Sequence, residues 1–362
     1  MKILMPYISR SGHNIHSKIM PGGIEKFCKN IFEMFPHDII PAEITREERK
    51  NKKTKQVFLD YVKKHNPDMI LISDIDSYFH IPQIEYGIPT IQIIHEPLVG
   101  DIRYVAVFKN LHKFVTAGGH IYFVSDNQQT FFNKNIKRIT GDTLSDVKGL
   151  INPSFSIGNE EVSTDIKYDV ITIGRTDILK NPFYVHKKLQ NTELTTCVIT
   201  NKDNFQHSDN QVKYFNDNLI WEEPQHTIRG LSYDDTMVTL SQAGCYISTC
   251  ANESWGITAL EALSRGIPVI LITDSSGKHS TQSIPVSEDH YRIVHRSIKP
   301  TELVDIVKEL LSFSYEKRLE ISRLTKEKHS KEEYKTALDK IFEARLNDVS
   351  PRQESILESF FQ

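Results

Sequence analysis

The sequence predicts an α/β protein made of two Rossmann-like, doubly wound domains that face each other across a cleft, with C-terminal helices packing across both. Its 362 residues are enough for two domains that each bury a core. Short runs rich in Ile and Val alternate with amphipathic segments, a pattern typical of a parallel sheet with crossover helices. The pattern stops near residues 149–159 and then starts again. We therefore expect an N-terminal domain over 1–155, a C-terminal domain over 156–313, and helices crossing back over 314–362.

The first domain contains apolar runs of strand length, each separated from the next by an amphipathic or charged segment. Its expected strands are 2–8, 68–73, 90–96 and 120–125. Its expected helices are 23–35, 46–65 and 103–115. This alternation of strands and helices predicts a parallel sheet, because parallel neighbours need a crossover connection.

The second domain repeats the alternation. Its expected strands are 168–174, 194–200, 218–223, 245–250 and 268–272. Its expected helices are 182–189, 233–243 and 254–265. From Thr301 onward the sequence has no run of strand type, and a strongly charged helix is expected from Tyr315 to about Leu346.

The composition is that of a soluble globular protein, with 39% hydrophobic and 25% charged residues. No run of about 18 apolar residues is present that could span a bilayer, and the N-terminus reads as a first core strand rather than a secretory signal. The cysteines fall in no CxxC spacing, so neither a zinc site nor a redox pair is indicated. We therefore expect a cytoplasmic protein with no integral membrane association.

Two glutamates, Glu253 and Glu261, stand eight positions apart ahead of an apolar strand. If the segment is helical, they lie about 12 Å apart along the axis. Paired carboxylates that hydrolyse one glycosidic bond lie about 5 to 9.5 Å apart, so an acid/base pair is not favoured. The spacing suits two anchors for one elongated ligand. Alternatively, Glu253 complements the start of the helix and Glu261 is a solvated surface residue.

Two further features place phosphate-binding groups beside expected helices, at the edge where open α/β sheets bind ligands. Arg175 and Lys180 follow the strand 168–174, and two such cations can neutralise a diphosphate without a metal. Gly22 and Gly23 precede a helix, where backbone N–H groups can approach phosphate oxygens closely. Each feature alone also fits an ordinary surface loop.

Polar residues follow two strands of the first domain. His95 and Glu96 follow the strand at 90, and a histidine there can bond a sugar hydroxyl or act on a proton, although a lone histidine is more often structural. Asp74 and Asp76 form a DxD pattern after another strand. We expect this pair to orient or deprotonate an acceptor rather than to bind a metal.

Taken together, four motifs in this order resemble the retaining GT-B glycosyltransferases of family four. They are GGIE near the N-terminus, His95 after an N-domain strand, GRxxxxK at the start of the second domain, and E-x7-E followed by ALSRGIPVI. The resemblance covers roughly residues 1–313. It implies the GT-B fold and transfer of a sugar from a nucleotide diphosphate sugar, UDP-linked, with retention and no required metal or other cofactor.

The resemblance also implies roles for individual residues. Glu261 would hold the ribose hydroxyls, and Glu253 would contact the transferred sugar with Ser254, Trp255, Gly256 and Ile257 nearby. Arg175 and Lys180 would grip the diphosphate leaving group. Gly22 and Gly23 would approach the phosphates, and His95 would lie near the reacting face of the sugar. Asn181 and Pro182 replace the usual glycine after the lysine, and Trp255 stands where Phe is more common; both affect the expected loop shape and sugar choice.

The acceptor is the least determined feature. Residues 1–150 carry 20 Lys and Arg against 16 Asp and Glu, whereas the rest carries 24 against 31. The first part is therefore net positive, which favours an anionic partner. The stretches YFVSDNQQTFF at 122–132 and IGRT at 173–176 resemble phage DNA α-glucosyltransferases, which favours duplex DNA with a hydroxymethylated base as acceptor, in the host cytoplasm if the protein is phage-encoded. Candidate acceptor residues are Asp74, Asp76 and Glu96. A cell-surface glycan or lipid-linked acceptor, a nucleotide-sugar epimerase and a non-catalytic nucleotide-sugar binder remain alternatives.

Overall fold

The computed structural model divides into two compact units, each described by itself. Unit 1 comprises Met1–Ser156 together with His329–Gln362, and unit 2 comprises Ile157–Lys328. The expected C-terminal helices are therefore shared, since those before residue 329 belong to unit 2 and the last one belongs to unit 1. The structure describes residues 1–9, 15–16, 23–73, 77–95, 104–141, 149–150, 161–175, 180, 182–200, 226–250, 255–273 and 287–348.

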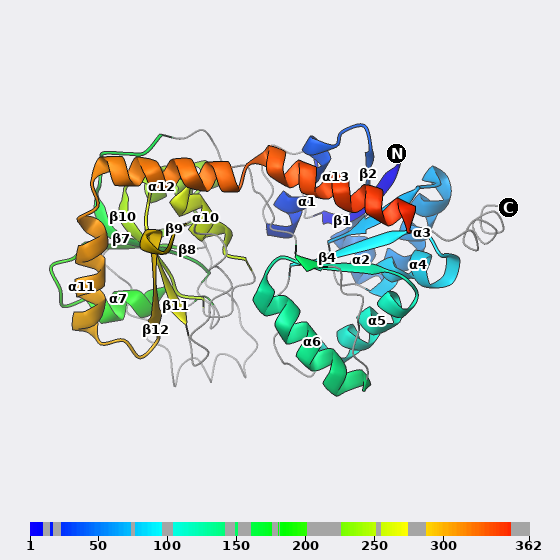
Figure 1. The fold of residues 1–362 in the computed structure, drawn as a ribbon, viewed down its shortest axis with the longest axis horizontal. Coiled ribbons are helices and arrows are strands. Elements are labelled where there is room, and N and C mark those ends of the chain that lie inside the picture. Colours follow the sequence, from blue (N-terminus) through cyan, green and yellow to red (C-terminus); the bar gives the residue numbers. More distant parts are fainter. Residues whose placement is uncertain are drawn as a thin grey trace. The chain divides into compact units, whose positions relative to one another are not determined.

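Unit 1 is built on a parallel sheet (Figure 1). Its described strands run in the order β2-β1-β3-β4-β5-β6. They are β1 (Ile3–Ser9), β2 (Ile39–Thr45), β3 (Met69–Ile72), β4 (Thr90–Ile94), β5 (His120–Phe123) and β6 (Gly149–Leu150). β2 was not expected, because Pro41 interrupts its apolar run. A proline is tolerated there because β2 lies at the edge of the sheet.

Helices cover the sheet of unit 1. They are α1 (Gly23–Met34), α2 (Arg46–Lys50), α3 (Thr54–His65), α4 (Ile81–Tyr86), α5 (Tyr104–Thr116), α6 (Asp126–Thr140) and α13 (Lys331–Asn347). The single helix expected over 46–65 is wrong. Lys52 has φ 57° and cannot continue a right-handed helix, so the segment forms α2 and α3.

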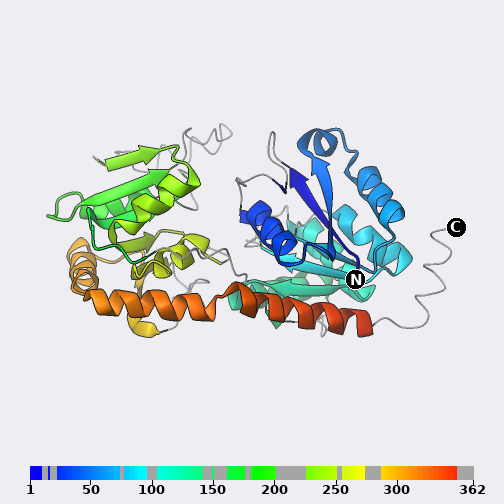
Figure 2. The ribbon, with the colours of Figure 1, turned by 90° about the horizontal axis from the view of Figure 1, so that it is seen from above.

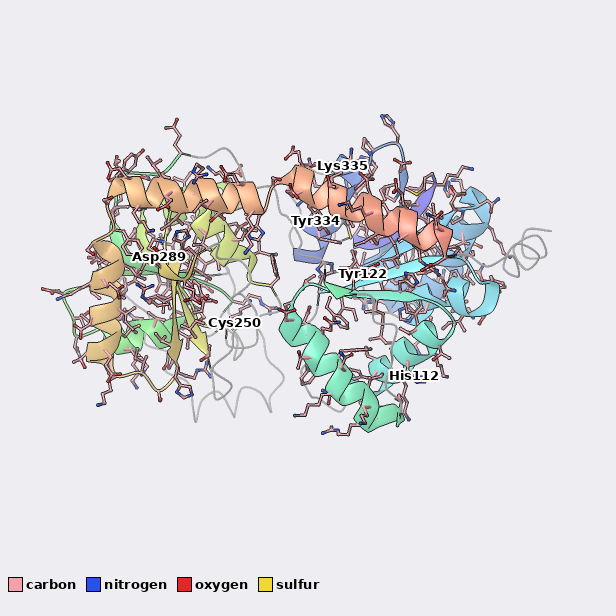
Figure 3. The ribbon with its side chains drawn as sticks, in the orientation of Figure 1. His112, Tyr122, Cys250, Asp289, Tyr334 and Lys335 are labelled. Carbon is pink, nitrogen blue, oxygen red and sulfur yellow. The ribbon has the colours of Figure 1, made fainter. Side chains whose placement is uncertain are left out.

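The last described helix, α13, packs on unit 1 through one buried face (Figure 3). The rings of Tyr334 and Phe27 lie 6.2 Å apart, and that of Phe342 lies 5.5 Å from Phe35. Near the end of the helix, the buried Arg345 donates through Nη2 to Gln83 Oε1 over 2.6 Å. Apolar burial and one buried polar contact thus join α13 to segments far away in the sequence.

Unit 2 contains a second parallel sheet, with strands in the order β12-β11-β10-β7-β8-β9. They are β7 (Tyr168–Ile173), β8 (Thr196–Thr200), β9 (His226–Arg229), β10 (Ala243–Ser248), β11 (Val269–Thr273) and β12 (Tyr291–His295). β9 and β12 were not expected; they form the two edges and are less buried than the central strands. The strand expected at 218–223 lies outside the described residues. Both sheets are parallel, so the predicted fold class, α/β with two Rossmann-like halves, is confirmed.

Helices also pack around the sheet of unit 2 (Figure 2), and most of them begin or end near their expected positions. They are α7 (Phe183–Leu189), α9 (Tyr233–Ser241), α10 (Ile257–Leu263), α11 (Pro300–Leu311) and α12 (Tyr315–Lys328). The expectation of a helix from Ser254 is wrong, because Gly256 has φ 81° and α10 starts only after it. The single charged helix expected from Tyr315 to Leu346 is also two helices, since Ser330 caps α13 through a bond from Glu333 N.

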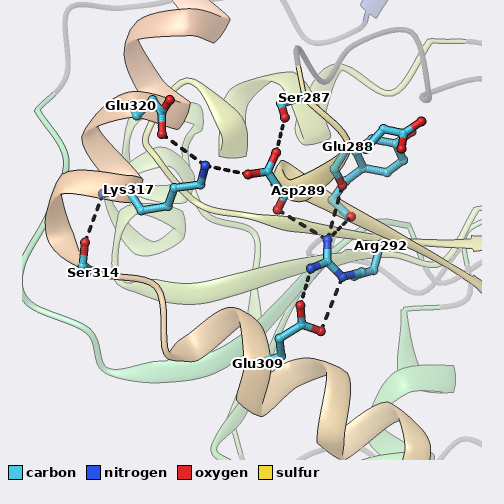
Figure 4. Close-up of polar contacts among 9 residues, drawn as sticks. Ser287, Glu288, Asp289, Arg292, Glu309, Ser314, Lys317 and Glu320 are labelled. Carbon is cyan, nitrogen blue, oxygen red and sulfur yellow. Dashed lines mark hydrogen bonds and ion pairs between the residues drawn. The ribbon is translucent and has the colours of Figure 1, made fainter.

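A polar network ties the start of β12 to α11 and α12 (Figure 4). Lys317 Nζ lies 2.7 Å from Asp289 Oδ2 and 3.1 Å from Glu320 Oε2, and the Ser287 hydroxyl donates to Asp289. Arg292 pairs with Glu309 of α11. The hydrogen bonds from Lys317 and Ser287 hold the pKa of the Asp289 carboxyl well below its ordinary value.

This network predicts a loss of stability in acid. A carboxyl whose pKa is lowered by folding stabilises the protein above its unfolded-state pKa of about 3.9, and that contribution is lost progressively as the pH falls from this value through the lower pKa of the folded state. We expect Asp289→Asn to lower the free energy of unfolding at pH 6, and to lower it less at pH 3. Urea unfolding at a series of pH values measures the difference. Lys317→Ala should likewise reduce the change in the free energy of unfolding between pH 6 and pH 3. If this free energy depends on pH equally in wild type and in both variants, the stabilising role of the Asp289 carboxylate is contradicted.

Candidate functional site

The carboxyl edge of the sheet in unit 2 carries the two predicted cations. β7 and β10 are neighbouring parallel strands, so their carboxyl ends lie side by side. Arg175 follows β7 by two residues and is exposed, while the preceding Gly174 N donates to Ile199 O of β8 over 3.1 Å. Arg175 is thus an exposed residue on a backbone that is fixed to the sheet.

The backbone at Lys180 and Pro182 is held at the same edge by hydrogen bonds from two threonines. A methyl group on Gly174 would lie 3.2 Å from Lys180 Cβ, so the glycine leaves room for the lysine stem. The Thr249 hydroxyl, just beyond β10, donates to the Lys180 carbonyl. The Thr172 hydroxyl of β7 donates to Pro182 O over 3.2 Å. These hydrogen bonds fasten the backbone at Lys180 to the end of β10 and the backbone at Pro182 to β7.

Glu261 lies on α10 and is only 8% exposed, although glutamates are seldom buried without a partner. Its Oε1 accepts a hydrogen bond of 2.7 Å from the hydroxyl of Tyr233, the first residue of α9. The alternative of a solvated surface glutamate is therefore wrong, because α10 is buried along Ala259–Leu263. Trp255, beside Gly256 at the start of this segment, is 3% exposed.

The separation of the two glutamates cannot follow the helical expectation, because α10 begins four residues after position 253. Several predicted residues lie outside the described residues. They are Gly22, Asp74, Asp76, Glu96, Glu253 and Ser254. Gly23 is described as the first residue of α1, and Ile257 as the first residue of α10. The roles predicted for all of them stay predictions.

His95 belongs to unit 1 and directly follows β4. Its ring lies 4.2 Å from that of Phe27 on α1, edge to face, and no described residue bonds its buried Nε2. Burial lowers the pKa of His95 to about 3. The imidazole is therefore neutral near pH 7 and can offer a hydrogen bond but no positive charge.

Sequence reasoning missed Thr249 and Tyr233. Thr249 is a small polar residue just after a buried strand, a position that could have marked it as facing the ligand edge. Tyr233 carries no such signal, because its contact with Glu261 spans 28 residues and depends on how α9 meets α10.

Other functional groups are limited within the described part of the chain. No group of three or more His, Cys, Asp and Glu side chains there could hold a metal ion. The cysteines, at positions 28, 197, 245 and 250, are buried thiols, and burial raises the pKa of Cys197 to about 11. Among the helices that are described, none has the length and apolar character to cross a membrane.

Comparisons with known proteins agree with this architecture. Residues 158–328 match the family described as glycosyl transferases group 1. HepE of Anabaena, in complex with UDP and glucose, has a TM-score of 0.71 at 14% identity over 95% of this chain and 100% of its own. Sucrose-phosphate synthase from Thermosynechococcus elongatus has a TM-score of 0.69 at 12% identity, over 95% and 99%. The lipopolysaccharide outer core galactosyltransferase WaaB has a TM-score of 0.60 at 16% identity, over 95% and 100%.

No curated protein sequence matches the chain. At these identities the structural matches establish the fold, and the family match covers unit 2. The chain thus has the GT-B fold, and its residues 158–328 are similar to the glycosyl transferases group 1 family.

Proposed function

We propose that the protein is a retaining glycosyltransferase of the family-four type that transfers a sugar from a UDP-linked donor to an acceptor hydroxyl. The observation that carries the proposal is the pair Arg175 and Lys180 at the carboxyl ends of β7 and β10, with the Lys180 backbone fastened by Thr249. The group 1 match over residues 158–328 and the UDP-glucose bound to HepE support a nucleotide-sugar donor.

In this proposal, the chemistry is mainly electrostatic. Cleavage of the donor leaves negative charge on the diphosphate, and Arg175 and Lys180 stabilise that charge as it develops. Glu261 accepts hydrogen bonds from the ribose, and Glu253 contacts the sugar with the backbone from Ser254 to Ile257. The acceptor attacks the face from which the nucleotide departs, so the anomeric configuration is retained.

Residues of unit 1 are proposed to contact the phosphates and the sugar of the donor. Gly22 and Gly23 bring the backbone close to the diphosphate. His95, neutral because of its lowered pKa, bonds a sugar hydroxyl. No step of the proposed reaction requires a metal ion.

We further propose that the acceptor is a hydroxymethylated base in duplex DNA. The segment that begins with α2 carries six exposed cations, namely Arg46, Arg49, Lys50, Lys52, Lys53 and Lys55. α2 begins directly after the end of β2, and His95 directly follows the end of β4. Both therefore lie at the carboxyl edge of one parallel sheet. Three strand spacings, about 14 Å, separate these strands. Duplex DNA carries a charge every 1.7 Å or so, and this segment could contact several phosphates while a base approaches His95.

Asp74, Asp76 and Glu96 complete the proposed acceptor site. Each follows a strand that ends at the same edge, and a carboxylate there would orient or deprotonate the attacking hydroxyl.

One experiment tests donor and acceptor together. The full chain is incubated with a panel of nucleotide sugars and hydroxymethylated duplex DNA, and the digested nucleosides are weighed. A hexose or pentose added to the modified nucleoside is the expected result. Transfer only to glycan or lipid-linked acceptors would overturn the DNA acceptor but keep the transferase. Conversion of donor without acceptor would indicate an epimerase, and UDP binding without turnover would indicate a non-catalytic binder.

The basic segment makes a separate prediction for DNA affinity. Replacing Lys50 and Lys55 with Gln should weaken duplex binding and reduce the slope of log K against log salt by about 2, since each lost phosphate contact contributes about 0.9. Replacing Lys331 and Lys340, exposed on α13, changes the net charge equally and serves as the control. Filter binding at several salt concentrations measures the duplex affinity and its salt dependence for the two double variants. Equal slopes in the two double variants would exclude this segment as the DNA contact.

A further inference from the structure

The hydrogen bond between Tyr233 and Glu261 joins a helix outside the predicted motifs to the proposed ribose-binding carboxylate. The Tyr233 hydroxyl lies 2.7 Å from Glu261 Oε1. Glu261 is 8% exposed, whereas Tyr233 is half-buried. A buried carboxylate needs donors to offset the loss of water, and a phenol is a strong neutral donor for it.

The start of α9 presents the phenol from a fixed position. The Ser232 side chain caps the helix by accepting from Asp235 N over 3.1 Å. Ser232 O accepts from Thr236 N over 2.9 Å and from the Thr236 hydroxyl over 2.7 Å. Met237 and Leu240 of the same helix are buried. Tyr233 is therefore the first residue of a helix that is both capped and packed.

The backbone of Glu261 is fixed as well. Its carbonyl accepts from Arg265 Nη1 and from the Ser264 hydroxyl, each over 2.9 Å. Ser264 O in turn accepts from the Ser322 hydroxyl of α12 over 2.6 Å. The bond from Tyr233 restricts rotation of the Glu261 side chain.

We propose that Tyr233 is a positioning residue that holds the Glu261 carboxylate in the orientation in which it receives the ribose hydroxyls. This inference rests on the proposed function of Glu261. A carboxylate offers about four acceptor positions, so a bond from one phenol is compatible with further bonds from the 2′ and 3′ hydroxyls. Ordering the carboxylate before the nucleotide arrives removes an entropy cost from binding.

The test compares UDP with 2′,3′-dideoxy-UDP, which lacks both ribose hydroxyls, by calorimetric titration of the full chain. Wild type should prefer UDP. Tyr233→Phe should weaken UDP binding about tenfold, the order expected for a lost bond to a charged group, and 2′,3′-dideoxy-UDP binding less than twofold. In the Glu261→Ala background, adding Tyr233→Phe should change neither affinity. Tyr168→Phe, at the amino end of β7, is the matched control and should keep the wild-type preference.

The outcomes separate the inference from the proposed function. If Glu261→Ala loses the preference for UDP but Tyr233→Phe keeps it, Tyr233 has only a structural role and the inference is wrong. If Glu261→Ala keeps the preference, Glu261 does not bind ribose and the proposed function of that residue fails. Tyr233→Leu, which also lacks the hydroxyl, is the second variant should the Phe variant not fold. A preference for UDP below that of wild type supports the inference, and an unchanged preference overturns it.

Discussion

Arg175→Ala and Lys180→Ala are each expected to lower donor turnover by about a hundredfold or more while leaving the fold intact. A fixed positive group aimed at developing charge contributes on the order of 3 kcal/mol to the transition state, which corresponds to this factor. The fold should persist because Arg175 is exposed and because the contact of Lys180 with Thr249 uses its backbone carbonyl. Release of UDP from the donor, followed over time, measures the effect.

The control for these variants is Lys187→Ala, which removes an exposed cation from α7 in the same unit. We expect its turnover to match that of wild type. Thermal unfolding of all three variants checks that a loss of turnover does not come from a loss of folded protein. Wild-type turnover in the Arg175 or Lys180 variant would remove the assignment of the diphosphate site.

Gly266→Ala is expected to destabilise the protein by about 3 kcal/mol or more. Gly266 has φ 71°, and an added methyl group would lie 2.3 Å from Arg318 O and 3.0 Å from Val162 Cγ2. Left-handed backbone costs about 1 to 2 kcal/mol for a residue with a side chain, and overpacking adds about 1 to 3. The contact atom is a helix backbone carbonyl, which cannot move independently of α12.

Urea unfolding measures this loss, and Gly141→Ala separates its two causes. Gly141 also has positive φ, at 82°, but an added methyl group would meet no atom within 4 Å. Its variant should lose only the backbone contribution, about 1 to 2 kcal/mol. If both variants lose the same free energy of unfolding, the close packing of Gly266 against Arg318 does not contribute to the cost of the Gly266 substitution.

The central strands and the helices between them could be predicted because the pattern of apolar residues is local. The errors come from single residues whose backbone conformation the pattern does not reveal. Lys52 turns left-handed and splits one expected helix, and Gly256 delays the start of α10. Pro41 concealed β2, which pairs at the edge of the sheet.

The candidate site was predictable only in part, for a similar reason. Arg175 and Lys180 stand together in the sequence, whereas the contact of Lys180 with Thr249 spans 69 residues. The burial of Glu261 and its bond from Tyr233 depend on the packing of α9 against α10, which no local spacing encodes. Residue type and spacing thus identify ligand-binding groups, but the groups that hold them appear only in three dimensions.

The assignment of α13 to unit 1 has a consequence for biosynthesis. Its Arg345 bonds Gln83 across 262 residues, and Tyr334, Leu338 and Phe342 are buried on the same helix. A ribosome synthesises every residue of unit 2 before it synthesises α13. The chain of unit 2 is therefore made in full before α13, whereas the sheet of unit 1 is made first and must wait for this helix to cover its apolar surface.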